Sequence, residues 1–303
     1  MNTALAKDKQ KQIRRKIRNR KLRETRDGYF FVFPYVIGVV AFFLMPLAFS
    51  LWISLGDYSL MQGGFKVEWA WLKHYNAAIM TNIEFTTNFA NTVKDAAIKT
   101  PLVVVFSLII AIVLDKQKRG SFIFKIIFFL PFLLGNGNVM RQLLGMDVAG
   151  GSISMARGVL LPNELMSYIG PGLYNVAATF LDNITLVLWR TGIPVILFLS
   201  ALENIPKSLY EAGTVDGASE WEKFWKITLP MISHIMLLTI VYCIIESFTD
   251  PSNPMVDMFY NYAFVGLQYS LSAAMSWIYF AFILILVLIV FAVMKPFMHS
   301  DFE

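Results

Sequence analysis

The sequence predicts an all-α protein that crosses a membrane with about six helices. Hydrophobic residues make up 56% of the 303 residues and charged residues only 16%, whereas an ordinary soluble domain carries about 25% charged residues. The charges gather in a few blocks between long apolar runs. Six of these runs reach the length of about 20 residues that a helix needs to cross the hydrocarbon core. The composition therefore excludes an ordinary soluble fold.

The expected spans follow one another along most of the chain. Each is apolar over most of its length and is bounded by polar or charged residues. The runs are 29–55, 91–114, 121–140, 176–201, 227–248 and 269–294. Spans two, three and four contain polar interruptions, which a membrane tolerates where the polar groups face protein or water.

The distribution of Lys and Arg predicts that both termini are cytoplasmic. Basic residues favour the cytoplasmic side in short loops. With the N-terminus inside, that side holds 19 of the 26 basic residues, and the outer side is acidic. Residues 1–28 hold eleven of them and are expected to form an arm that orients the chain and lies on anionic headgroups. The alternative for this N-terminal arm is a segment that binds nucleic acid or has a regulatory role. At the other end of the chain, residues 296–303 are expected to form a short cytoplasmic tail.

Neither a cleaved signal peptide nor a metal site is expected. The first apolar run continues past the small residues Ala48 and Ser50, and the apolar core of a signal peptide is only about 7 to 15 residues long. The single cysteine, Cys243, excludes an intrachain disulfide. The three His residues do not have the spacing of metal ligands.

A polar segment between spans four and five, residues 203–226, begins with the signals of a short helix. Pro206 suits the first turn of a helix, because it lacks the N–H that would be unpaired there. Asp216 and Gly217 are expected to end the helix, since glycine readily adopts the left-handed conformation that closes helices.

A second helix is expected directly after the first. Ser219 and Glu222, three residues apart, have the pattern of a capping box. The helix would place Trp221 and Trp225 four apart on one face and would continue directly into span five through residues 227–230. A force on this loop would therefore reach the membrane core.

The same loop carries a motif at fixed spacing. Glu211-Ala212-Gly213, three residues, Gly217, nine residues and Ile227-Thr228-Leu229-Pro230 match the pattern E-A-A-x3-G-x9-I-x-L-P, except for Gly213 in place of Ala. The chain thereby resembles the permease subunits of bacterial binding-protein-dependent ABC importers. Further segments look like the maltose-type, carbohydrate branch of that family: Phe33-Pro34 to Pro46, Asn91-Thr92-Val93, Phe128 to Pro131 and Leu202 to Pro206.

The resemblance covers residues 29–295 and implies a permease domain with the type I ABC importer fold. The domain would lie in a bacterial cytoplasmic membrane, and the loop 203–230 would couple it to an ATPase. In one respect the chain departs from the family: Ser252-Asn253-Pro254 stands where Gly-Gly-Pro often follows span five. The residues expected to carry the coupling are Glu211, Ala212, Gly213, Asp216, Gly217, Ile227, Leu229 and Pro230.

The resemblance also implies the partners. The expected assembly contains this chain, a second homologous permease, two ATPase subunits and an extracytoplasmic solute-binding protein in a lipid bilayer, with no nucleic acid. The sequence has no G-x-x-x-x-G-K-[ST] loop to cradle phosphates. We therefore expect no cofactor and no catalysis on this chain, with ATP and Mg²⁺ on the partner ATPases.

Polar residues at membrane depth are candidates for the substrate path, because burying them in lipid is costly. Arg190 stands in span four close to Gly192 and Pro194, which can interrupt the helix. The alternative for each charged candidate is an intramembrane salt bridge, and this is the favoured interpretation of Lys99 with Asp95. The candidates are Asn136, Asn138, Trp189, Arg190, Tyr242, Glu246 and Lys99.

The function predicted from these observations is uptake of a sugar or oligosaccharide by an ATP-driven importer. One alternative uses the same machinery for a polyol or a glycerol-phosphate-like solute, whose anionic group Arg190 and Lys99 would bind. The other alternative is a polytopic membrane enzyme or scaffold, which predicts acid/base or metal clusters that the sequence does not show.

Overall fold

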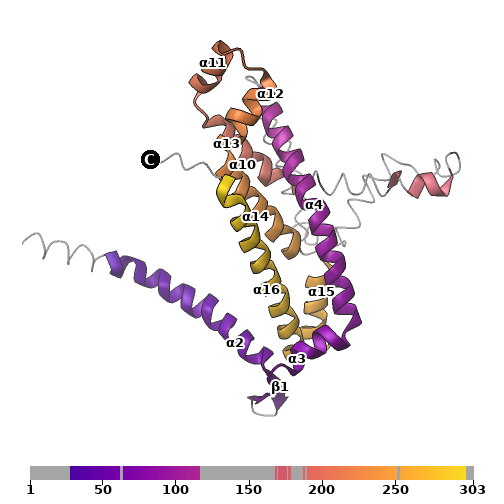
Figure 1. Cartoon of the computed structure of the whole chain (residues 1–303). Helices are drawn as coiled ribbons and strands as arrows, with labels where there is room; N and C mark the ends of the chain where they lie inside the picture. Colours follow the sequence, from indigo (N-terminus) through magenta and orange to yellow (C-terminus); the bar gives the residue numbers. More distant parts are fainter. Residues whose placement is uncertain are drawn as a thin grey trace, which may run out of the picture. The chain divides into compact units, whose positions relative to one another are not determined.

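The computed structural model describes residues 28–61, 64–116, 190–250 and 253–297, together with 168, 170–175, 177, 178 and 187. The chain divides into two compact units, residues 1–74 and 75–303 (Figure 1). The expected basic arm, span three and most of the C-terminal tail lie outside the described residues. So do most of residues 176–189 in span four and the candidates Asn136, Asn138 and Trp189.

The described part of the first unit contains a long apolar helix and a β-hairpin. The helix Gly28–Ser54 has 27 residues and confirms the expected first span. It contains a π-helical turn, η1 (Val40–Leu44), followed by α2 (Met45–Ser54). Strand β1 (Gly56–Met61) pairs antiparallel with β2 (Gly64–Trp69).

The hairpin, which was not expected from the sequence, is held at its base by an ion cluster. The Asp57 carboxylate contacts Lys73 Nζ at 2.8 Å and His74 Nε2 at 2.7 Å, at the start of α3 (Lys73–Asn76). The pKa of Asp57 lies below its ordinary value, chiefly because Lys73 donates a hydrogen bond to it.

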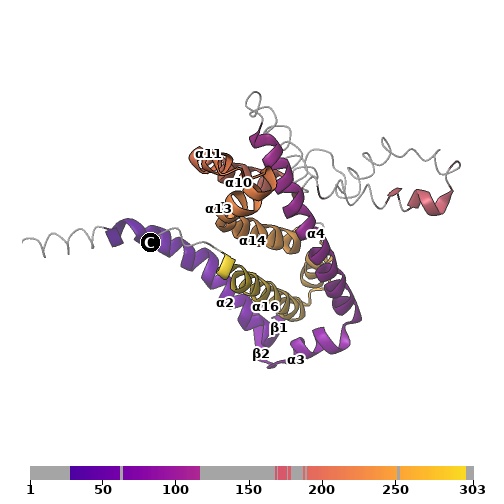
Figure 2. The same ribbon diagram turned by 45° about the horizontal axis from the view of Figure 1, so that its top comes forward.

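The described part of the second unit is built around four helices: α4 (Ile83–Asp115), α10 (Gly192–Glu203), α14 (Ser233–Thr249) and α16 (Tyr269–Met294). Helix α4 packs against α10 and α14, and α14 packs against α16 (Figure 2). Helix α16 confirms the expected sixth span. Helix α4 begins before the expected residue 91, because a π-helical turn, η2 (Ala77–Thr81), and the Asn82 N-cap precede it.

The described residues form two large apolar clusters in the interior. One joins Phe248, Met255 and Met275, and the other joins Phe198 and Ile232 with their neighbours. In its most apolar window α16 is only 6% buried. Its outer side therefore remains apolar, as expected of a helix that faces lipid or another subunit.

The outer loop after α14 is organised by the side chain of Asn253. This loop leads into α15 (Pro254–Tyr260) and a π-helical turn, η4 (Asn261–Val265). The Asn253 amide donates to Tyr279 Oη at 3.0 Å. Its oxygen accepts from Thr92 Oγ1 at 3.2 Å and from the Met255 N–H at 2.9 Å. At the position where the chain departs from Gly-Gly-Pro, one buried amide thus joins α4, α15 and α16.

The fifth span differs from the expectation that a helix continues directly through residues 227–230. The helical segment Glu220–Met231 and α14 meet at a bend of 71°. Ile232, fully buried at the bend, has a ψ of 4°, outside the α-helical range. The straight part of the span is therefore α14 alone, whose 17 residues measure about 25 Å. Among the described residues, three helices are long and apolar enough to cross a membrane, and the bent pair gives a fourth.

Candidate functional site

The first helix of the polar loop, α11 (Lys207–Val215), has the boundaries that the sequence predicts. Pro206 is its N-cap. Gly217 has a φ of +77°, in the left-handed region that other residues rarely adopt. The N–H of Ala218 donates to Gly213 O at 2.8 Å and that of Gly217 to Thr214 O at 3.1 Å. This pair of bonds is the Schellman closure of a helix.

The predicted capping box of the second helix is also confirmed. The Ser219 hydroxyl accepts from the Glu222 N–H at 3.3 Å, and the Glu222 carboxylate accepts from the Ser219 N–H at 2.9 Å. Because the Glu222 carboxylate accepts from both the N–H and the hydroxyl of Ser219, the pKa of Glu222 lies below its ordinary value. The helical path then runs through α12 (Glu220–Lys223), a π-helical turn, η3 (Phe224–Thr228), and α13 (Leu229–Met231).

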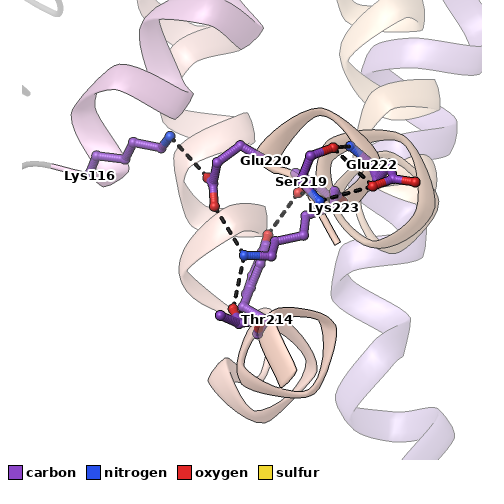
Figure 3. Close-up of polar contacts among 8 residues, drawn as sticks. Lys116, Thr214, Ser219, Glu220, Glu222 and Lys223 are labelled. Atoms are coloured by element: carbon purple, nitrogen blue, oxygen red, sulfur yellow. Dashed lines mark hydrogen bonds and ion pairs between the residues drawn. The ribbon is translucent and has the colours of Figure 1, made fainter. Parts of the chain in front are cut away.

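Two polar contacts fix α11 on the segment that follows it. Lys223, which is 9% exposed, donates from Nζ to Thr214 Oγ1 at 2.9 Å (Figure 3). Tyr210 Oη lies 2.9 Å from Thr228 Oγ1. Tyr210 and Thr214 are four residues apart, so both contacts lie on the same side of α11. We call α11 together with residues 216–231 the coupling unit.

The coupling unit is also joined to α4. Glu220 accepts from Lys223 Nζ at 3.1 Å and lies 3.5 Å from Lys116 Nζ, just after α4 ends (Figure 3). The pKa of Glu220 is lowered, first by the hydrogen bond from Lys223 and then by the charge of Lys116. Both Glu220 and Lys116 are exposed, and such surface pairs contribute at most about 1 kcal/mol. This link to α4 is therefore weak and easily broken.

Gly213 packs closely against the segment that follows α11. A Cβ on Gly213 would lie 3.2 Å from Ile227 Cδ1 and 3.6 Å from Lys223 Cγ. Gly213 is buried, whereas Glu211, Ala212 and Asp216 are exposed. Five of the predicted coupling residues thus separate into two groups. Gly213 and Ile227 pack inside the coupling unit, whereas Glu211, Ala212 and Asp216 form an outer face that is free to contact a partner.

Three substrate-path candidates come together near the outer end of α14. Arg190 Nη2 contacts Asp250 Oδ2 at 2.5 Å, and both side chains are mostly buried. Tyr242 hydrogen-bonds to Glu246, and Arg190 is close enough to Glu246 to act on it electrostatically. Asp250 was not a candidate, because it follows the expected fifth span, 227–248, and so falls in an outer loop. Its position directly after span five was the signal that could have identified it.

Lys99 is engaged on its own helix. Its Nζ lies 2.8 Å from Asp95 Oδ2, one turn earlier on α4. The salt bridge that the sequence favoured is therefore confirmed. Whether any of these residues contacts a solute stays a prediction, as does the coupling role of the loop.

Comparison with known proteins gives consistent matches. The family described as binding-protein-dependent transport system inner membrane component matches residues 85–297. The probable ABC transporter permease protein YesP of Bacillus subtilis (strain 168) is 26% identical over 295 residues, 90% of this chain and 92% of that protein. The arabinooligosaccharides transport system permease protein AraP of the same organism is 30% identical over 231 residues, 73% and 68% of the two chains.

The fold also matches solved structures. One is the crystal structure of a bacterial ABC transporter involved in the import of the acidic polysaccharide alginate. A chain in it superposes with a TM-score of 0.64 at 16% identity, covering 91% of this chain and 98% of that one.

Proposed function

The chain belongs to the family of binding-protein-dependent transport system inner membrane components, and from that premise we propose that it imports a neutral sugar or oligosaccharide as a permease subunit. Members of the family are transport components, so the chain is not an enzyme. The observation that carries the proposal is the coupling unit. It combines polar contacts that hold α11 on the segment leading into α14 with an exposed face formed by Glu211, Ala212 and Asp216.

The proposed importer contains several further subunits. Two ATPase subunits would bind ATP and Mg²⁺, and one of them would receive α11 of this chain. A second permease would complete the membrane path, and an extracytoplasmic solute-binding protein would deliver the solute. The exposed carboxylate of Glu211 suits a basic residue of the ATPase, since charge-assisted hydrogen bonds fix register.

The geometry supports a mechanical connection between the two ends of α14. At its inner end, α14 continues from the coupling unit through the bend at Ile232. At its outer end, about 25 Å away, it carries the cluster of Arg190, Glu246 and Asp250. A displacement of α11 would therefore move α14 and with it the residues proposed to line the path. This is the alternating-access step that ATP would drive.

Charge pairing favours a neutral solute over an anionic one. Lys99 and Arg190, the two cations that would have bound a phosphate, each contact a carboxylate of the same chain. An anion at Arg190 would have to displace Asp250, which leaves a mostly buried carboxylate without its partner. Sugars need only hydrogen bonds and aromatic faces, which Tyr242 can supply.

Reconstituting the complex in vesicles tests the proposal. Glu211→Ala and Gly217→Val should each lower solute uptake and ATPase stimulation severalfold, while the subunits still co-purify. Lys66→Ala, on the exposed hairpin, is the matched control and should leave uptake unchanged. Normal uptake by both loop variants would contradict the coupling role.

A further inference from the structure

Trp221 and Trp225 form an exposed aromatic pair on the coupling unit. Their side chains are 69% and 49% exposed, although large aromatic residues are normally mostly buried. The two rings lie 5.5 Å apart in an edge-to-face arrangement, and Phe224 lies 5.2 Å from Trp225. The three rings stabilise one another as a preformed aromatic surface.

This aromatic surface points away from α11. Lys223 contacts Thr214, and Ile227 packs close to Gly213, so positions 223 and 227 face α11. Residues two apart on a helix lie on roughly opposite sides of it. Trp221 and Trp225, each two residues before one of these positions, therefore lie on the opposite side of the segment.

The bend places this side toward the bilayer. The segment Glu220–Met231 makes an angle of 71° with α14. Spanning helices tilt by about 20° on average, so a spanning α14 holds the segment close to the membrane plane at its cytoplasmic end. In Figure 1, α11 lies at one end of the second unit, farther from the centre of α14 than α12 and α13. With α11 on the cytoplasmic side of the segment, its opposite side faces the headgroups.

We propose that Trp221 and Trp225 anchor the coupling unit in the headgroup layer of the cytoplasmic leaflet. Tryptophan favours this layer, because its ring is apolar and its N–H donates a hydrogen bond. The exposed Lys226 lies 3.7 Å from Glu222. The anchoring is therefore attributed to the two tryptophan rings and not to an unpaired positive charge. The inference rests on the proposed function only in requiring that α14 spans the membrane with this loop in the cytoplasm.

The anchor gives the coupling unit a fixed depth. The exposed face of α11 is on one side of the unit, and the aromatic surface is on the other. A force that an ATPase applies to α11 would therefore act against a segment held by the bilayer. The unit would pivot on the aromatic pair and move α14, instead of sinking into the lipid.

Spin-label accessibility in the assembled complex tests this placement. Single cysteines at 221 and at 225, in a Cys243→Ala background that keeps uptake, are labelled in nanodiscs of phosphatidylcholine and phosphatidylglycerol. We expect both labels to be more accessible to oxygen than to a water-soluble nickel reagent, with and without the ATPases. A label at the exposed Val215 on α11, measured without the ATPases, is the matched control and should show the reverse.

The other results would overturn the anchor. Labels that react like Val215 would place the aromatic pair in water. Labels shielded from both reagents only when the ATPases are bound would place it on the ATPase, and labels always shielded from both would place it against the second permease. Because this measurement does not depend on transport, a complex without uptake but with lipid-accessible labels would contradict the proposed function and support the anchor.

Discussion

Lys223 shows how one side chain organises the coupling unit. Its stem packs beside Gly213, and its ammonium group reaches Thr214 on α11 and Glu220 on its own helix. A buried lysine is costly unless it is paired, so these contacts hold the two helices in one geometry. The motif does not include Lys223, and the sequence alone did not identify it, because its partner Thr214 belongs to a different helix.

We predict that Lys223→Met separates ATP hydrolysis from transport. Methionine keeps most of the apolar stem but removes the donors, so α11 would lose a charged hydrogen bond worth about 1.5–3 kcal/mol. Solute taken up per ATP hydrolysed should fall severalfold, and the amides of α11 should exchange hydrogen faster. Lys226→Met, at an exposed position, is the control. Equal effects of both substitutions would contradict the positioning role.

Gly213→Ala should stabilise α11 or leave it unchanged. Alanine is favoured over glycine inside a helix by about 1 kcal/mol, and the new Cβ meets only the mobile tip of Ile227, at 3.2 Å. Hydrogen exchange of the α11 amides should therefore slow or stay the same. Gly217→Ala provides the contrast: it should accelerate exchange, because φ there is +77°. Faster exchange in the Gly213 variant would mean that Ile227 cannot move aside.

At the scale of helices and loops, the outer loop after α14 shows what a local sequence motif can and cannot predict. The sequence identified the departure from Gly-Gly-Pro at residues 252–254 but not its consequence. Asn253 uses both ends of its amide to connect helices that are distant in sequence. No local pattern encodes these partners, since Thr92 precedes it by 161 residues.

Asn253→Ala is expected to destabilise the second unit by about 2–4 kcal/mol, because several buried partners lose their bonds together. The melting temperature of the purified complex should fall, whereas Asn91→Ala, at an exposed position on α4, should leave it unchanged. An unchanged melting temperature for both variants would show that the loop is held by apolar packing alone.

At the scale of the whole molecule, the sequence predicted the parts that depend on continuous patterns. The spans 29–55 and 269–294 are long apolar runs with polar ends, and the helices follow them closely. The bend at Ile232 was missed because hydropathy stays high across 227–248, so composition gives no sign of a change in direction. The pairing of Arg190 with Asp250 was missed because 60 residues separate them. Contacts between distant segments are fixed by packing, which local patterns do not contain.

The Arg190–Asp250 pair permits a test of whether Arg190 serves structure or the solute. Removing one partner of a mostly buried pair leaves an uncompensated charge and costs about 3–5 kcal/mol, whereas removing both costs less. If Arg190 mainly joins the start of α10 to the outer end of α14, then Arg190→Gln and Asp250→Asn should each lower the melting temperature and the uptake rate. The double variant should recover a large part of both. Asp257→Asn, an exposed carboxylate of the same outer loop, controls for charge. If melting recovers in the double variant but uptake does not, Arg190 has a role in transport beyond the ion pair, because the restored fold would still lack a group that the solute needs.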